Sequence, residues 1–119
     1  MDQSTYLSAA RCLQGDAVRL RRLFHQYPEA SKGEVNTNRL IRAELDSAGI
    51  AYLAPEVNIT IALLPGARPG KTAAIRSDTD AIEVAEMNDA AYRSRHDGLM
   101  HACGHDAHMA MGLTAARLL

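Results

Sequence analysis

The stretch Met100-His101-Ala102-Cys103-Gly104-His105-Asp106-Ala107-His108 says most about how this 119-residue chain folds. It holds three of the chain's five histidines and one of its two cysteines. From about Ala107 an almost wholly apolar run continues to Leu119, and a helix of that composition must be buried. Asp106 can cap this helix or hydrogen-bond a neighbouring imidazole. The stretch therefore predicts a turn rich in metal-binding side chains at the start of a buried helix.

The side chains of this turn are good ligands for zinc and similar divalent ions. In extended backbone, His101, Cys103 and His105 alternate onto one face, and Gly104 allows a tight bend between the last two. We predict Cys103 and His105 as metal ligands, with His101 and His108 as further candidates. On ligand chemistry alone a core role for the cysteine is still open, because free cysteines are often simply buried.

A second candidate group comes earlier in the chain, where Thr72 to Arg76 predicts a strand that leads directly into Asp78-Thr79-Asp80. Ligand sites in α/β sheets gather at the carboxyl ends of strands. The two carboxylates can therefore bind a hard metal ion or orient a ligating histidine. The alternative is a plain strand-ending turn, in which aspartate is common, and these residues alone favour it.

Upstream of both groups, the sequence predicts a helix from about Thr5 to Gln26. Its apolar residues can share much of one face: Leu13, Leu20, Leu23, Phe24 and Tyr27. Gly15-Asp16 weakens the middle of the helix, and Pro28 ends it. Cys12 lies in this helical pattern and is interpreted as a small buried residue.

A second helix follows, with Ser31 and Glu34 at the spacing of a capping box. It runs to about Ala48, and Gly49 is well placed to stop it in the left-handed conformation. Two strands are predicted next, at Ile50 to Leu53 and at Ile59 to Leu64. The order of two helices, then strands, then a buried helix predicts an α/β fold.

The composition excludes several classes of function. Thirteen basic and fourteen acidic residues give a net charge of -1, whereas nucleic-acid or membrane-surface binding needs a basic excess. No apolar run reaches the roughly eighteen residues of a membrane span, and the polar start of the chain lacks the features of a signal peptide. We expect a cytoplasmic protein with a small-molecule substrate and with no nucleic-acid or membrane partner.

Three blocks, residues 21–29, 75–82 and 100–108, occur in the order and spacing of one metallopeptidase group. From about Leu20 to Leu119 the chain resembles the aminoacylase and carboxypeptidase family, which includes hippurate hydrolases and auxin-conjugate hydrolases. The block around Cys103 is the most specific, and the other two support it. The chain departs from the family at Glu83, where the family has a proline that shapes the loop.

This resemblance implies a catalytic α/β domain interrupted by a smaller lid domain, and a site with two divalent ions of zinc, manganese or cobalt. Cys103 and His105 match metal ligands of the family, and Asp80 matches a residue beside the metals that orients a ligand. Asp78 falls where more distant relatives place a ligating histidine. His25 matches a helix residue that is better explained structurally.

The same resemblance implies that residues 1–119 are the N-terminal portion of a single, truncated catalytic domain. The family's general-base glutamate, the ligand next to it and two later histidines have no counterpart before Leu119, and neither has the lid domain. The apolar final helix agrees with this, because it needs the remainder of the domain, or a second copy of the chain, to cover it.

The predicted function of the complete enzyme is metal-dependent hydrolysis of the amide bond in N-acyl amino acids or related small amides. Two alternatives are open. The chain can be an inactive metal-binding or interaction fragment, because two protein ligands do not complete a catalytic zinc site. It can also be a redox or nucleophilic cysteine protein that uses Cys103 with a nearby histidine.

Overall fold

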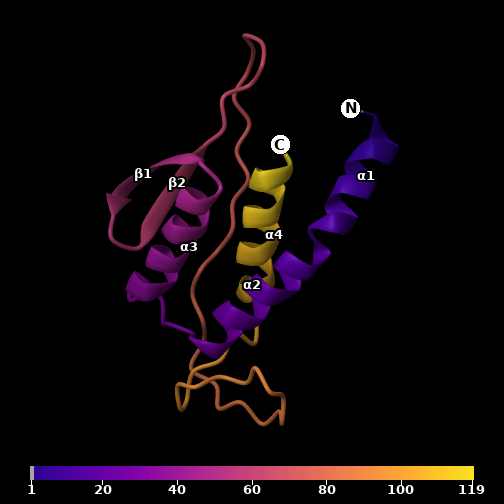
Figure 1. Ribbon diagram of the computed structural model, residues 1–119. Coiled ribbons are helices and arrows are strands. Elements are labelled where there is room, and N and C mark those ends of the chain that lie inside the picture. Colours follow the sequence, from indigo (N-terminus) through magenta and orange to yellow (C-terminus); the bar gives the residue numbers. More distant parts are fainter. Residues whose placement is uncertain (1) are drawn as a thin grey trace.

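The computed structural model describes residues 2–119. Within that range the chain forms four helices and one two-stranded sheet (Figure 1). The elements are, in chain order, α1 (Gln3–Cys12), α2 (Gln14–Gln26), α3 (Val35–Ser47), β1 (Ala51–Glu56), β2 (Ile59–Leu63) and α4 (His105–Leu118). The predicted α/β class is confirmed. None of the helices in residues 2–119 is long and apolar enough to cross a membrane.

The first predicted helix is two helices, α1 and α2, which meet at Leu13 rather than at Gly15-Asp16. Leu13 has φ -90° and ψ -2°, which opens the helical hydrogen-bond ladder, and the glycine already lies inside α2. The predicted end before Pro28 is confirmed, since Tyr27 leaves the helical region with φ -125° and ψ 60°.

The start of α3 corrects a second expectation, because no side chain at the cap position hydrogen-bonds the helix. The predicted capping box of Ser31 and Glu34 is therefore wrong. Instead the carboxylate of Glu29, on the preceding segment, accepts from the backbone N–H groups of Asn36 at 3.1 Å and Thr37 at 2.7 Å. A carboxylate outside the helix thus satisfies its first donors. At the other end the prediction holds, and Gly49 is left-handed with φ 67°.

The two predicted strands after Gly49 pair with each other as an antiparallel hairpin. Ala51 lies opposite Leu63 and Leu53 opposite Ile61, with a register shift before Glu56 pairs with Ile59. The expected third strand at 72–76 is wrong. Figure 1 shows β2 leading into a long arm that returns beside α4, away from the hairpin. An extended segment without a hydrogen-bonding neighbour does not form a strand.

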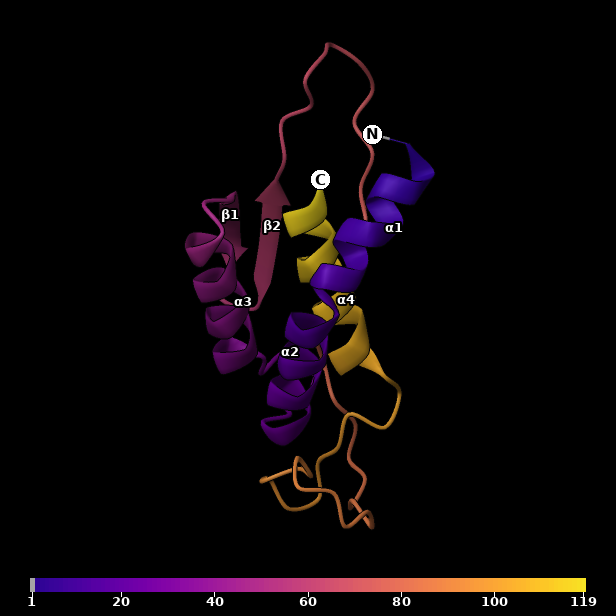
Figure 2. The same cartoon turned by 45° about the vertical axis from the view of Figure 1, so that its right-hand side comes forward.

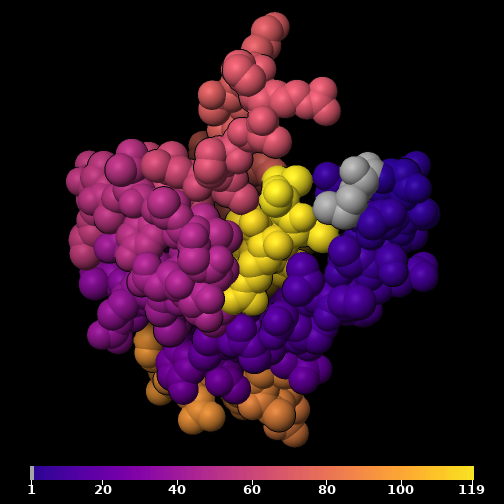
Figure 3. Space-filling model, turned by 45° about the horizontal axis from the view of Figure 1, so that its top comes forward, coloured from indigo at the N-terminus to yellow at the C-terminus, as the bar shows by residue number. Residues whose placement is uncertain are grey.

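The hydrophobic core lies between α2, α3 and α4, and Figure 2 shows these helices side by side. Its buried members are Leu20, Phe24, Leu45, Met109, Ala110 and Leu113. Met111 on α4 is 58% exposed, so residues 2–119 cover only part of this apolar helix, as the sequence predicts. Figure 3 shows the last turns of α4 at the surface between the hairpin and α1. One expectation about burial is wrong. Cys12, at the end of α1, is exposed rather than packed in the core.

The segment that carries the two aspartates is held tightly against α4. Ser77 Oγ donates to the carbonyl of His108 at 3.1 Å. A Cβ atom at Gly112 would lie 2.6 Å from the same Ser77 oxygen, so a larger residue there would displace the hydroxyl from this position. Further along, Ile82 and Met100 exchange two backbone hydrogen bonds of 3.1 and 3.0 Å. These contacts bring residues 78–80 to the first turn of α4.

Candidate metal centre

The first turn of α4 begins at Gly104, which adopts a left-handed conformation with φ 89° and ψ 16°. Its carbonyl accepts from the backbone N–H groups of Ala107 and His108, each at 3.1 Å. His105 and His108 are three residues apart in this turn and therefore lie on neighbouring positions of the helix surface. Their rings stack, with centroids 5.4 Å apart and planes at 27°.

Asp78 joins these two histidines to form a group of three potential metal donors. One ligand atom from each of the three residues lies within 4.8 Å of the others. Among residues 2–119, this is the one place where three or more histidine, cysteine or acidic side chains lie close enough to bind the same ion. His105 Nε2 lies 4.0 Å from Asp78 Oδ2. Two imidazole nitrogens and a carboxylate oxygen form a donor set suited to zinc, manganese or cobalt, so the residues fit a metal ion.

Asp80 contacts the other ring nitrogen of His105, Nδ1. His105 Nδ1 lies 2.9 Å from the Asp80 carbonyl oxygen and 3.0 Å from its carboxylate Oδ1. Because both of these partners are acceptors, Nδ1 is the nitrogen that donates, and a neutral ring then has Nε2 available to bind an ion. A carboxylate on the far nitrogen of a ligating histidine fixes its tautomer and orientation. The orienting role of Asp80 stays a prediction. It requires the Asp80 carboxylate to lie within hydrogen-bond distance of His105 Nδ1, as it does here.

The surroundings of Asp78 favour its ionised form. The hydrogen bond from Arg76 Nε, at 2.9 Å, is the main cause that lowers the pKa of Asp78, and the charge of Arg76 acts in the same direction. The Arg76 side chain is 88% exposed, so this ion pair is weak. A cation could therefore replace Arg76 as the partner of Asp78 with little loss of free energy.

The remaining predicted ligands lie outside the three-donor group. Cys103 is exposed and is not one of its members. His101 is 3% exposed, and neither of its ring nitrogens has a hydrogen-bond partner within the described residues. Burial lowers the pKa of His101, which keeps the ring neutral. The sequence pattern placed His101, Cys103 and His105 on one face, whereas the structure groups His105 with Asp78 and His108.

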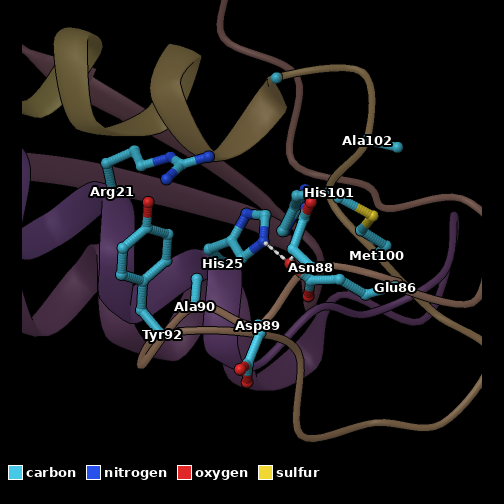
Figure 4. A pocket seen from close by; sticks show the side chains of 11 residues that line it. Arg21, His25, Glu86, Asn88, Asp89, Ala90, Tyr92, Met100, His101 and Ala102 are labelled. Carbon is cyan, nitrogen blue, oxygen red and sulfur yellow. Dashed lines mark hydrogen bonds and ion pairs between the residues drawn. The ribbon is translucent and has the colours of Figure 1, made fainter.

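A buried polar network lies on the other side of the turn, and Figure 4 shows its centre at His25. His25 Nδ1 is 2.7 Å from Asp106 Oδ2, and its Nε2 is 3.0 Å from Glu86 Oε1. Two roles were expected for Asp106, capping α4 or hydrogen-bonding an imidazole. Gly104 holds the cap position and Asp106 lies inside the first turn, so the capping role is wrong. Asp106 does hydrogen-bond an imidazole, that of His25. Sequence reasoning missed Glu86, which lies in an irregular stretch 61 residues from His25.

A polar cavity of about 570 Å³ opens beside this network. Its walls include Arg21 and Tyr92 on one side and His101 and Ala102 on the other (Figure 4), and Gly104 also lines it. Tyr92 is covered by the guanidinium groups of Arg21 and Arg22, 5.2 and 4.9 Å from its ring centre. The cavity therefore lies between the polar network and the turn that carries the candidate ligands.

Known proteins resemble this chain over most of its length. The model of Peptidase family M20/M25/M40 matches residues 74–119. Thermostable carboxypeptidase 1 of Saccharolobus solfataricus is 42% identical over 105 residues, covering 86% of this chain and 26% of that protein. IAA-amino acid hydrolase ILR1-like 4 of Arabidopsis thaliana is 41% identical over 102 residues, covering 86% of this chain and 23% of that protein. The crystal structure of Bacillus subtilis YXEP, described as a dinuclear metal binding peptidase from the M20 family, superposes with a TM-score of 0.87 at 37% identity, over 92% of this chain and 31% of that one.

These matches define a class of metal-dependent hydrolases. The chain is a relative of the M20/M25/M40 peptidase family, and the resemblance predicted from its three sequence blocks is confirmed. The chain spans about a quarter of the length of the curated relatives it matches. The rest of the fold seen in the Bacillus structure therefore lies outside these 119 residues.

Proposed function

We propose that the complete protein to which these residues contribute hydrolyses the amide bond of N-acyl amino acids or related small amides, with divalent metal ions. One observation carries the proposal: Asp78, His105 and His108 offer donor atoms within 4.8 Å of one another at the first turn of α4. The names of the relatives support it, since one is an IAA-amino acid hydrolase and another a carboxypeptidase. The Bacillus relative is described as dinuclear, which supports two ions.

The residues of this chain have separate tasks in the proposed reaction. His105 binds an ion through Nε2, and Asp80 holds the ring by its other nitrogen at 3.0 Å. Cys103 binds as a thiolate, while Asp78 and His108 complete the donor set. Ions held by these residues would supply Lewis-acid chemistry, which polarises a scissile carbonyl and lowers the pKa of a water molecule. The general base, which the family resemblance implies is a glutamate, lies outside residues 1–119.

A second candidate function is metal binding without hydrolysis by the 119 residues alone. The observation that favours it is coverage, because the chain corresponds to only 31% of the solved relative. In this case the donor group binds an ion, but the groups that activate the water are absent. A small-molecule substrate and a cytoplasmic location, both expected from the composition, stay predictions.

The experiment that tests the proposed function compares the complete enzyme with the 119-residue chain. Each is stripped with a chelator, resupplied with zinc, manganese or cobalt, and assayed on a panel of N-acyl amino acids and dipeptides. We expect metal-dependent hydrolysis by the complete enzyme and metal binding without hydrolysis by the chain. Activity that survives the chelator but is lost on thiol alkylation would instead identify Cys103 as a nucleophile. Hydrolysis of dipeptides alone would reject N-acyl amino acids as the substrate class.

A further inference from the structure

Four ionisable side chains form one continuous network behind the candidate metal centre. His25 lies between two carboxylates, with Asp106 Oδ2 at 2.7 Å and Glu86 Oε1 at 3.0 Å. Arg21, one helical turn before His25 on α2, approaches the same Asp106 oxygen with its Nε at 2.9 Å. The side chains of His25, Glu86 and Asp106 are 3%, 2% and 0% exposed. The network is therefore shielded from water at its centre.

The hydrogen bonding of this network is complete. Each nitrogen of His25 faces a carboxylate oxygen, so both can donate when the imidazole carries two protons. Together with Arg21, such an imidazolium balances the two carboxylates charge for charge. Because a buried charge without its partner is strongly unfavourable, the four groups hold one another in place.

The network joins three parts of the fold that are distant in sequence. Arg21 and His25 belong to α2, Glu86 belongs to the irregular segment 83–99, and Asp106 belongs to the first turn of α4. Glu86 also accepts from the backbone N–H of Ser94 at 2.5 Å, which fixes its own segment. Asp106 accepts from the backbone N–H of Ala107 at 2.9 Å, which fixes the start of α4.

The first turn of α4 depends on this anchor for a specific reason. Its cap residue is Gly104, and no side chain caps the helix. A helix start without a capping side chain tends to fray. Asp106 ties the turn to α2 instead, and its neighbour in the chain is the candidate ligand His105. The contact between Asp106 and His25 thus fixes the backbone next to His105, while the contact with Asp80 fixes the orientation of the His105 ring.

We infer that His25 and Asp106 act as positioning residues, a clasp that holds the first turn of α4 so that His105 and His108 meet Asp78. This inference rests on the proposed metal centre for its function, but the clasp itself can be tested without a metal. His25 touches none of the candidate ligands through the hydrogen bonds described above. Its effect on them is therefore transmitted through Asp106.

The chain offers a matched control in two adjacent arginines. Arg21 and Arg22 both cover the ring of Tyr92, at 5.2 and 4.9 Å. Of these two arginines, Arg21 pairs with Asp106, and within the described residues Arg22 does not. Replacement of Arg22 by glutamine removes a charge and a ring contact from the same helix without touching the clasp.

The test measures two properties of the 119-residue chain in His25→Gln, Asp106→Asn and the control Arg22→Gln. The first is the hydrogen-exchange rate of the His108 amide, which bonds the Gly104 carbonyl. The second is the affinity for Zn²⁺. We expect the two clasp variants to exchange this amide about 10-fold faster, with the last turns of α4 unchanged, and to bind Zn²⁺ about 10-fold more weakly. Arg22→Gln should match the wild type in both.

The outcomes separate the clasp from the metal centre. Unchanged exchange at His108 in both clasp variants would overturn the clasp, whatever the metal does. Faster exchange with unchanged Zn²⁺ affinity would overturn the positioning role. If the wild-type chain binds no Zn²⁺, the proposed metal centre fails, and the exchange rates still decide on the clasp. If Asp106→Asn unfolds the chain, so that all amides exchange faster, His25→Gln carries the test because its glutamine keeps one hydrogen bond.

Discussion

The first turn and the middle of α4 both hold fully buried side chains, but these are buried by opposite means. In the middle of the helix, Met109 and Leu113 belong to the same buried apolar cluster as Phe24 of α2. At its N-terminus, Asp106 is buried among charged partners, with His25 as the nearest. Met109 is 2% exposed and Asp106 is 0% exposed, so burial alone does not distinguish these two parts of the helix. We call them the apolar half and the polar end.

The difference lies in what each kind of burial specifies. Apolar packing is non-directional, and it stabilises any arrangement that removes the same area from water. Hydrogen bonds to buried charges act only at particular distances and angles, so they fix positions. The apolar half should therefore determine whether the chain folds, and the polar end should determine whether the donor atoms meet. Substitutions can separate these two effects.

The largest effect is expected in the apolar half, from Phe24→Ala. Loss of a buried phenylalanine leaves a cavity and should lower the free energy of unfolding by about 3–5 kcal/mol. Urea unfolding of the 119-residue chain measures this. Val18→Ala is the matched control, since Val18 lies on the same helix but is 42% exposed. Equal losses in the two variants would contradict the assignment of the core to α2, α3 and α4.

The next effect is expected at the polar end, from His105→Ala in the complete enzyme. Activity should fall more than about 100-fold, because loss of an orienting partner alone costs about 10–100-fold and His105 is a proposed ligand. The unfolding curve should hardly move, since His105 is only partly buried. His96→Ala, which removes an exposed histidine of segment 83–99, is the control. Full metal content with near-normal turnover in His105→Ala would remove the metal centre as proposed.

The sequence predicted well those features whose cause is local. Gly49 ends α3 because a left-handed residue favours glycine, and its φ is 67°. The hairpin strands are visible in short apolar runs. The segment 72–76 has the same local character, but it has no neighbouring strand within the described residues. A strand forms only when a second segment hydrogen-bonds to it, and the residue pattern of one segment does not show whether such a partner is present.

The candidate site divides in the same way. Asp80 could be placed beside a ligand because it follows an apolar segment and matches a residue of the family. The hydrogen bonds of His25 could not be predicted, because its two partners lie 61 and 81 residues away. Glu86 stands in a stretch with no periodicity, so nothing near it signals a buried carboxylate. Long-range polar pairs of this kind leave no mark on local composition.

A smaller loss is expected from Asp80→Asn, which sharpens the comparison within the polar end. Asparagine keeps the size of the side chain but lacks the charge that holds the proton on His105 Nδ1, now 3.0 Å away. Metal affinity or activity should fall about 10–100-fold, with some metal still bound. Metal analysis and kinetics of the complete enzyme measure both. Wild-type behaviour would favour the plain turn that the sequence alone suggested.

The effect of Glu86→Gln should be smaller and should depend on pH. Burial raises the pKa of Glu86, but hydrogen bonds from the Ser94 N–H and from His25 outweigh it, so the pKa lies below its ordinary value of 4.5. A lowered pKa contributes stability above the ordinary value, which is lost as the pH falls through the lowered one. At pH 7 we expect the variant to lose about 1 kcal/mol of unfolding free energy. Below pH 4.5 the gap between wild type and variant should close, and a gap that is constant in pH would contradict this role of Glu86.

The smallest effect is expected at Cys12, which was expected in the core but lies at the surface. Cys12 and Cys103 are both exposed, so they form a matched pair of thiols. Cys12→Ser should change the free energy of unfolding by less than about 0.5 kcal/mol and leave metal content unchanged, because exposed positions tolerate substitution. Mass spectrometry after alkylation sharpens the contrast in the wild type: both thiols should react without metal, and Zn²⁺ should protect only Cys103, whose thiolate then binds the ion. Equal labelling of Cys103 with and without Zn²⁺ would exclude it as a ligand, and the centre would then consist of the Asp78, His105 and His108 group alone.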